Sequence, residues 1–232
     1  MTSRDVLVAR LARVAQELGD LADEVTVVGG TSPALYPMNE AVALRPTLDV
    51  DVILRTASLS EWHAFVAKIQ RRGFKQPHGD DVPICRYVKA DLTLDVMPSD
   101  PKQLGFGNRW YDEAARQRIV ASVAGLHVVA PIYFIATKLD AFEGRGADAP
   151  MMSHDLEDIF VVVRGLPGVV REIETGNGAV HAAIRGQLRA LLSKDDAIDI
   201  VHAMLEGDAA TQSIAPRLLA ELRRAYGAVG DE

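Results

Sequence analysis

The stretch "VTVVGGTSPALY", residues 25–36, decides the predicted fold. It starts as an apolar strand, is interrupted by Gly29 and Gly30, and continues in a pattern that favours a short helix. Because glycine has no Cβ, the backbone N–H groups at such a corner and at the following helix N-terminus can approach a phosphate closely. A glycine pair after a strand is more often only a tight turn, and the stretch has neither a GxGxxG nor a P-loop pattern.

The next predicted strand, in "TLDVDVIL" at residues 47–54, carries Asp49 and Asp51. Alternate residues of a strand point to the same face, so both carboxylates project together while Val50 and Val52 point into the core. Like charges that close repel each other, and a fold tolerates them at a solvated edge or where divalent cations neutralise them. The pair alone is therefore compatible with an exposed polar strand face or with a metal site.

A third carboxylate, Asp95, follows in "DLTLDVMP" at residues 91–98. Alternation places Asp95 on the polar face of this strand, whereas Asp91 falls in a turn and is expected to face solvent. We expect Asp95 on an antiparallel strand that lies beside the first pair. Three converging carboxylates suit Mg²⁺, and hard oxygen ligands of this kind hold two metal ions in enzymes of phosphoryl and nucleotidyl transfer.

The surrounding patterns predict an α+β fold in two parts. Residues 1–130 are expected to form a mixed sheet core flanked by helices, and residues 131–232 an all-helical half. In the first part we expect an amphipathic helix over residues 6–18, a helix that is N-capped by Ser60 and stops at Gly73, and two strands around the "KAD" turn at residues 89–91. A short strand in "LHVVAP" at residues 126–131 ends the sheet. In the second part Pro131 suits a first helical turn, Ser153 precedes an acidic first turn, and three further helices are expected.

Composition narrows the function classes. The formal charge of −7, a pI near 5.4 and 6% aromatic residues argue against broad electrostatic or stacking capture of nucleic acid. The single cysteine, Cys85, excludes an internal disulfide and is expected to be a small buried residue. No apolar run approaches the roughly 18 residues of a membrane span, and charges interrupt the N-terminal pattern, so we expect no membrane association and a cytoplasmic location.

Taken in order, these motifs resemble the nucleotidyltransferase superfamily, whose fold is that of DNA polymerase beta. The most similar branch is the AbiEii-type nucleotidyltransferases, the toxin components of bacterial type IV toxin–antitoxin and abortive-infection systems. The resemblance runs from about residue 25 to residue 165, and the remaining C-terminal helices carry none of it. Its motifs are "VVGGTSPALY", "RPTLDVDVIL", "LDVMP", "IATKLDAFEGRG" and "SHDLEDIF".

For the nucleotide, the resemblance implies that Gly29, Gly30 and the hydroxyl of Thr31 or Ser32 hold the triphosphate. Lys138 matches the lysine of the family's helical motif and would contact the triphosphate as well. A plain alternative for Lys138 is an exposed helix residue that pairs with nearby acids.

For catalysis, the resemblance implies that Asp49 and Asp51 bind the metals, with Asp95 as third ligand or as the base that accepts the proton of the acceptor hydroxyl. Asp155, with Asp158 on the same helical face, matches the family's last acidic motif and would orient Lys138 or the base. Arg45 and Arg145 also stand where the family often has arginines. The chain departs from the family at His154, where a basic residue is usual, and His154 reads equally as an ordinary first-turn residue.

The implied activity is Mg²⁺-dependent transfer of a nucleoside monophosphate from a nucleoside triphosphate to an acceptor hydroxyl. In the toxin branch the acceptor is the 3′ end of tRNA or a protein side chain, and a cognate antitoxin is an implied partner. Two alternatives stay open at this point. One is a non-catalytic nucleotide-binding or regulatory protein of the same fold, and the other is a transferase that modifies a small molecule such as an antibiotic.

Overall fold

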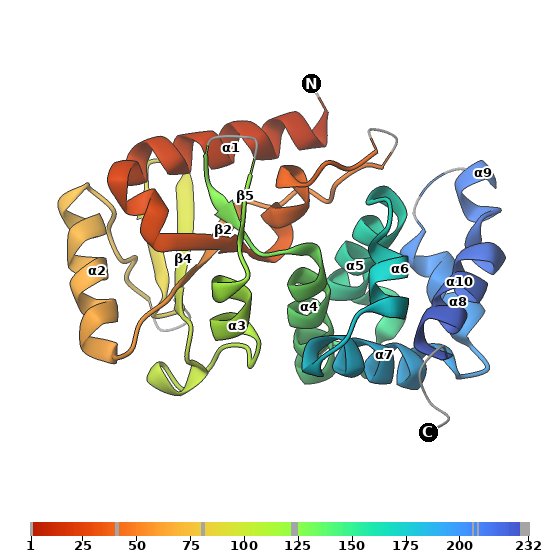
Figure 1. Cartoon of the computed structure of the whole chain (residues 1–232). Helices are drawn as coiled ribbons and strands as arrows, with labels where there is room; N and C mark the ends of the chain where they lie inside the picture. Colours follow the sequence, from red (N-terminus) through yellow and green to blue (C-terminus); the bar gives the residue numbers. More distant parts are fainter. Residues whose placement is uncertain are drawn as a thin grey trace. The chain divides into compact units, whose positions relative to one another are not determined.

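The computed structural model describes residues 2–39, 42–79, 82–121, 125–205, 207 and 209–227, and it divides the chain into two compact units (Figure 1). The sheet unit comprises Met1–Pro37 and Ala43–Ala130, and the helical unit comprises Met38–Val42 and Pro131–Glu232. Each unit has its own buried apolar residues and is described separately. The mixed sheet with its helices confirms the predicted α+β class.

The sheet unit is built on a six-stranded mixed sheet with the order β3-β4-β2-β1-β6-β5. Its central strand β2 pairs antiparallel with β1 and parallel with β4, while β6 runs parallel to β1. The outer strands β3 and β5 pair antiparallel with β4 and β6. The bounds are β1 Val25–Val28, β2 Asp49–Leu54, β3 Arg86–Lys89, β4 Leu92–Pro98, β5 Ile119–Val120 and β6 His127–Val128.

Helices cover this sheet, and α1 packs against β4 and the 3₁₀ helix η2. The Thr2 hydroxyl and the Asp5 carboxylate form a capping box at the start of α1, and its apolar stripe is buried as the spacing predicts, although Val6 is 40% exposed. The helical elements of the unit are α1 Ser3–Leu18, η1 Gly19–Glu24, η2 Gly29–Leu35, α2 Leu59–Arg71, η3 Pro101–Gln103 and α3 Tyr111–Arg116.

The N-cap of α2 is Ser58, so the expectation of Ser60 is wrong. The Ser58 side chain accepts a hydrogen bond from the backbone N–H of Glu61 at 3.3 Å, and the Glu61 carboxylate accepts one from the N–H of Ala57. The first bond satisfies a backbone donor that the first helical turn leaves without an intrahelical partner, and the second holds the residue just before the N-cap. Ser60 therefore lies inside the first turn.

The strand that carries Asp95 is parallel to β2, where the sequence had suggested an antiparallel neighbour. After β2 the chain passes through α2 and returns as β3, and the turn at Ala90 and Asp91 then reverses it again. Because β4 lies between β2 and β3, this second reversal makes it antiparallel to β3 and parallel to β2. The sequence patterns also missed α3 and the two-residue strand β5.

The helical unit contains only helices in the part of the chain that the structure describes. Its first helix, α4, starts at Pro131, and α5 is capped by Ser153, both as predicted. Within the described ranges five helices follow α5, where three were expected, and breaks at residue 168 and at residues 176–178 separate α5, α6 and α7. The bounds are α4 Pro131–Arg145, η4 Pro150–Met152, α5 His154–Gly165, α6 Val169–Thr175, α7 Ala179–Leu192, α8 Ala197–Met204, α9 Ala209–Gln212 and α10 Ala215–Gly227.

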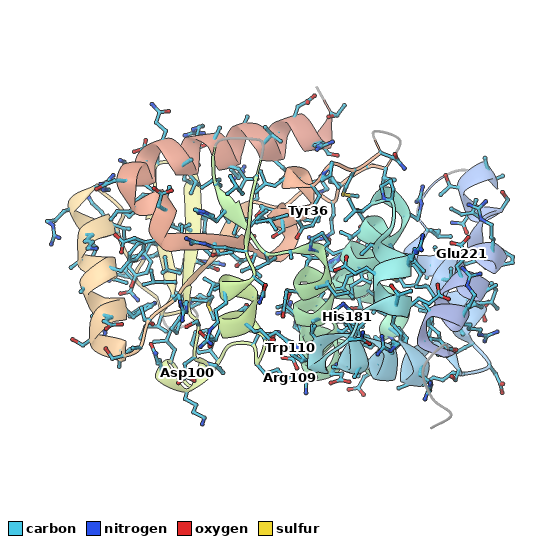
Figure 2. All side chains as sticks on the ribbon, in the orientation of Figure 1. Tyr36, Asp100, Arg109, Trp110, His181 and Glu221 are labelled. Carbon is cyan, nitrogen blue, oxygen red and sulfur yellow. The ribbon has the colours of Figure 1, made fainter. Side chains whose placement is uncertain are left out.

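Apolar side chains fill the interior of the helical unit (Figure 2). The last helix, α10, packs against α6, α7 and α8, and it buries Leu219 and Leu222 in the interior. Burial of this kind, rather than helix propensity, provides most of the stability of such short helices.

Cys85 is 3% exposed, which confirms that it is a buried residue of the sheet unit. Burial, and then the charge of Asp95, raise the pKa of its thiol to about 12, so the thiol stays protonated near neutral pH. No helix within the described ranges is long and apolar enough to span a membrane.

Candidate active site

The sheet brings the three predicted carboxylates together. Asp49 and Asp51 lie on β2 with Val50 fully buried between them, as the alternation predicts. Strand β4 places Asp95 directly beside Asp51 in the parallel register. One ligand oxygen from each of the three side chains lies within 4.8 Å of the others. Among the described residues, these three aspartates, called the carboxylate triad below, form the cluster whose spacing suits a metal ion.

The glycine corner adjoins the triad. Val28, the last residue of β1, pairs with Asp51, and the chain then turns at Gly29 with a φ of +72°. A Cβ at position 29 would lie 2.0 Å from Oδ2 of Asp51, a separation that no side chain can accept. Two features therefore require glycine at position 29. The backbone there is left-handed, and the Asp51 carboxylate packs directly against it.

Thr31 and Ser32 lie in η2, directly after the corner, with exposed fractions of 1% and 0%. The buried Oγ1 of Thr31 has no hydrogen-bond partner within the described part of the chain. Gly29 and Gly30, in contrast, are partly exposed. The backbone of the two glycines is thus the part of the corner that an anion would reach first.

Arg86 on β3 is a residue of the site that sequence reasoning missed. Its Nε and Nη2 donate to Oδ1 and Oδ2 of Asp95 at 2.9 and 2.6 Å, and Nη2 also lies 3.2 Å from Oδ2 of Asp49. The hydrogen bonds to Asp95 raise the pKa of the Arg86 guanidinium further above its usual range, so it is permanently charged. The sequence did hold a signal, because a turn at Ala90 and Asp91 sets Arg86 opposite Asp95 in the β3–β4 hairpin.

Asp91, which was expected to face solvent, lies outside the triad and pairs with Arg13 on α1. The two guanidinium nitrogens of Arg13 donate to its two carboxylate oxygens at 2.8 and 2.6 Å, with both side chains at least half exposed. This hydrogen-bonded ion pair lowers the pKa of Asp91 to about 2. Like the Arg86–Asp95 pair it joins two guanidinium nitrogens to two carboxylate oxygens, but it is far more exposed.

Lys138 and Asp155 meet within the helical unit. Nζ of Lys138 on α4 lies 3.1 Å from Oδ1 of Asp155 and 2.6 Å from Oδ2 of Asp158, both on α5, and all three side chains are less than 10% exposed. Arg145 donates to both oxygens of Asp155 at 2.8 and 2.9 Å. Burial alone would raise the pKa of Asp155, but the hydrogen bonds from Arg145 and the charge of Lys138 lower it overall. Lys138 is therefore a buried partner of two aspartates and not an exposed helix residue.

His154 is the first residue of α5, and its exposed ring lies with Nδ1 3.0 Å from Oε2 of Glu157. This is the ordinary first-turn position that the sequence allowed. Arg45 is half-buried in the sheet unit, on the segment that leads to β2.

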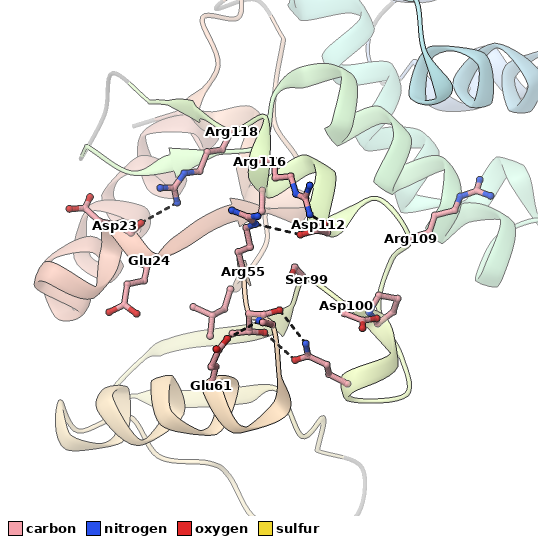
Figure 3. Close-up of a pocket in the computed structure, with 16 residues that line it drawn as sticks. Asp23, Glu24, Arg55, Glu61, Ser99, Asp100, Arg109, Asp112, Arg116 and Arg118 are labelled. Atoms are coloured by element: carbon pink, nitrogen blue, oxygen red, sulfur yellow. Dashed lines mark hydrogen bonds and ion pairs between the residues drawn. The ribbon is translucent and has the colours of Figure 1, made fainter.

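A groove of about 1020 Å³ opens at the far ends of β2 and β4, beyond the triad (Figure 3). Arg55 and Arg116 both pair with Asp112, at 3.5 and 2.6 Å, and Arg118 donates to backbone carbonyl oxygens. Arg109, labelled in Figures 2 and 3, stacks over the ring of Trp110 at 5.4 Å. Because five carboxylates line the groove beside these four arginines, its charge does not favour a polyanion, and no predicted site residue lines it.

Comparisons with known proteins agree with this architecture at the level of the fold. The chain is similar to the solved structure of an antigenic nucleotidyltransferase-like protein from Paracoccidioides brasiliensis, with a TM-score of 0.52 and 18% sequence identity. The match covers 86% of this chain and 92% of that chain. No protein-family model matches the sequence, and no curated protein matches it either. The chain thus has a nucleotidyltransferase-like fold with a carboxylate triad on two neighbouring strands of its sheet.

The contact between Gly29 and Asp51 predicts that alanine at position 29 lowers the free energy of unfolding more than alanine at position 105 does. Gly105→Ala places a Cβ on a left-handed backbone with φ of +77° and no atom within 4 Å, so it should cost about 1 kcal/mol. Gly29→Ala adds the clash with Asp51 to the same backbone strain, and should cost at least about 1 kcal/mol more. Urea denaturation of both variants checks this, and equal midpoints would show that Asp51 does not pack against the corner.

The Lys138 cluster predicts a loss of stability when its cation is removed. Lys138→Met leaves Asp158 buried without the ammonium that lies 2.6 Å away, and should destabilise the protein by about 3 kcal/mol. Lys194→Met, an exposed site in the same unit, should change stability by less than about 0.5 kcal/mol. The urea midpoints of the two variants give the comparison. Similar midpoints would mean that the ion pairs of Lys138 contribute no more to stability than an exposed lysine does.

Proposed function

We propose that this protein is a Mg²⁺-dependent nucleotidyltransferase that moves a nucleoside monophosphate from a nucleoside triphosphate to an acceptor hydroxyl. The observation that carries the proposal is the carboxylate triad, which lies against a glycine corner on a nucleotidyltransferase-like fold. Nucleotidyl transfer needs this combination, since the protein must neutralise phosphate charge and align two substrates.

The residues present fit a divalent cation. Asp49, Asp51 and Asp95 supply hard carboxylate oxygens within 4.8 Å of one another, which is the donor set that Mg²⁺ prefers. The Asp51 carboxylate lies at the corner, in the space that a Cβ on Gly29 would fill. When bound, Mg²⁺ would supply charge neutralisation on the phosphates and a lower pKa for the acceptor hydroxyl.

In this proposal the triad and the glycine corner of the sheet unit bind the cation and the phosphates. Asp49 and Asp51 hold the cation, and Asp95 is either its third ligand or the group that accepts the proton of the acceptor hydroxyl. The backbone N–H groups of Gly29 and Gly30 donate to phosphate oxygens, because the corner is open there. Thr31 and Ser32 are buried, so we propose that they support the shape of the corner and contact the triphosphate only if the corner opens.

The resemblance to AbiEii-type toxins supports a finer version of the proposal. It assigns a triphosphate contact to Lys138 and an orienting role to Asp155, so that the helical domain over residues 131–232 would complete the nucleotide site. The ion pairs between Lys138, Asp155 and Asp158 are compatible with the orienting role. On the same resemblance we propose a toxin of a toxin–antitoxin or abortive-infection system. It would act on the 3′ end of tRNA or on a protein, in the cytoplasm where nucleoside triphosphates are available, with a cognate antitoxin as its partner.

One observation favours a second candidate, a non-catalytic nucleotide-binding or regulatory protein. Arg86 neutralises part of the triad without any metal, so the fold can hold its three carboxylates as a structural cluster. Such a protein would bind a nucleotide at the glycine corner and transfer nothing. A transfer assay separates the two candidates.

The proposed reaction predicts transfer of label from one of the four α-labelled nucleoside triphosphates to total tRNA or to protein, in the presence of Mg²⁺. Asp49→Asn combined with Asp51→Asn should reduce transfer by about 100-fold or more, because these side chains hold the cation. Asp91→Asn, in the turn between β3 and β4 and outside the triad, should retain it.

The result has three informative forms. Label on RNA or on protein that requires Asp49 and Asp51 establishes the transferase and its acceptor class. Label on an added aminoglycoside alone points to the small-molecule alternative. No transfer by a protein whose melting temperature rises with nucleotide would reject the enzyme in favour of the binding protein.

A further inference from the structure

Arg86 uses the same carboxylate oxygens that a metal ion would need. Its bonds take both oxygens of Asp95 and reach Oδ2 of Asp49, while Oδ1 of Asp49 accepts a hydrogen bond from the Thr47 hydroxyl at 2.7 Å. All four oxygens of Asp49 and Asp95 are therefore engaged by protein groups. A cation bound by the whole triad must displace some of these contacts or share an oxygen with them.

We propose that Arg86 is a built-in cation of the triad, which occupies the Asp95 side of the site in the metal-free protein and leaves it when a divalent cation binds there. This inference rests on the proposed function, since it concerns the same metal site. It assigns Arg86 a positioning role: it holds Asp95 in place and sets how tightly the triad binds metal.

Burial explains why a built-in cation is needed. The Asp95 side chain is only 9% exposed, and a buried carboxylate without a partner is costly. With Arg86 in place on Asp49 and Asp95, the three carboxylates of the triad keep two formal negative charges in excess, and these attract an incoming divalent cation. The cluster is thus stable without metal and still attracts it.

The Arg86 side chain is exposed enough to leave the triad. Its side chain is 31% exposed, whereas Lys138 in the helical unit is 9% exposed between its two aspartates. The guanidinium can rotate toward solvent on its flexible stem while β3 stays in the sheet. An incoming triphosphate offers a released guanidinium bidentate hydrogen bonds in exchange for Asp95.

Manganese titration of the full chain tests this directly, with Mn²⁺ as a spin probe in place of Mg²⁺. Arg86→Gln removes the competing charge and should tighten Mn²⁺ binding by about tenfold or more. Arg13→Gln is the matched control, because it removes a bidentate arginine–aspartate pair of the same unit outside the triad, and its affinity should equal that of the wild type. Thermal melting without metal should show Arg86→Gln below the wild type, with a larger rise when Mn²⁺ is added.

A further variant ties the effect to Asp95. In an Asp95→Asn background, Arg86→Gln should change Mn²⁺ affinity by less than it does with Asp95 present, since the carboxylate that accepts two of the three Arg86 hydrogen bonds is gone. Arg86→Lys, which keeps the charge and loses the bidentate geometry, should fall between wild type and Arg86→Gln.

Two outcomes would overturn the inference, and they differ in what else they reject. If Mn²⁺ binds to wild type and Arg86→Gln equally, or more weakly to Arg86→Gln, and binding still requires Asp51, the metal site stands and the competing role of Arg86 is wrong. If neither protein binds Mn²⁺ at millimolar concentration, the proposed metal site fails together with the inference.

Discussion

Repulsion between three carboxylates on two adjacent strands is the constraint on which the sheet unit depends. Asp51 and Asp95 are direct neighbours in the parallel register, and Asp49 projects from the same face of β2. Apolar side chains between them, Val50 and Leu94, anchor the strands in the core and fix this spacing. The sheet cannot relax by moving the charges apart without exposing that core. The repulsion must instead be balanced by cations, and Arg86 is a cation that the chain itself supplies to Asp49 and Asp95.

The helical unit solves a similar problem by a different arrangement. Asp155 and Asp158 are buried on α5, and Lys138 and Arg145 from α4 balance them. Lys138 is enclosed, whereas Arg86 is nearly one-third exposed. Burial thus distinguishes the enclosed ion pairs of Lys138 from those of Arg86, whose partial exposure supports our proposal that a metal ion enters there. The same contrast explains why we expect substitution of Lys138 to act on stability and substitution of Arg86 to act mainly on metal affinity.

Several features of the fold followed directly from residue patterns. Period-two alternation placed Asp49 and Asp51 on one face, and the Pro131 and Ser153 signals marked the starts of α4 and α5. The N-cap of α2 was missed although Ser58 and Glu61 have capping-box spacing, because a second serine lies two residues on. Strand direction could not be predicted in the same way. Whether β4 runs parallel or antiparallel to β2 depends on where β3 lies in the sheet, which is a long-range choice.

The candidate site also combines features that local sequence patterns predict with features that depend on long-range strand pairing. The triad and the glycine corner were visible in the sequence, because carboxylate spacing and missing side chains are local signals. The hydrogen bonds of Arg86 with Asp95 and the approach of Asp51 to Gly29 depend on strand register, which is set by the turn at Ala90 and Asp91 and by the β1–β2 pairing. Composition gave no indication of Arg86, which is one of the 25 basic residues of an acidic chain, and the signal for it was its place opposite Asp95 across the turn at Ala90 and Asp91.

We propose above all that the triad is a metal site beside a phosphate-binding corner. A crystal of the full chain grown with Mn²⁺ and a non-hydrolysable nucleoside triphosphate tests it most directly, by anomalous scattering from the metal. We expect an anomalous peak within about 2.0–2.5 Å of oxygens from Asp49 and Asp51, with phosphate oxygens facing Gly29 and Gly30. A nucleotide bound elsewhere, for example in the groove beside Arg55 and Arg116, with no peak at the triad, would contradict it.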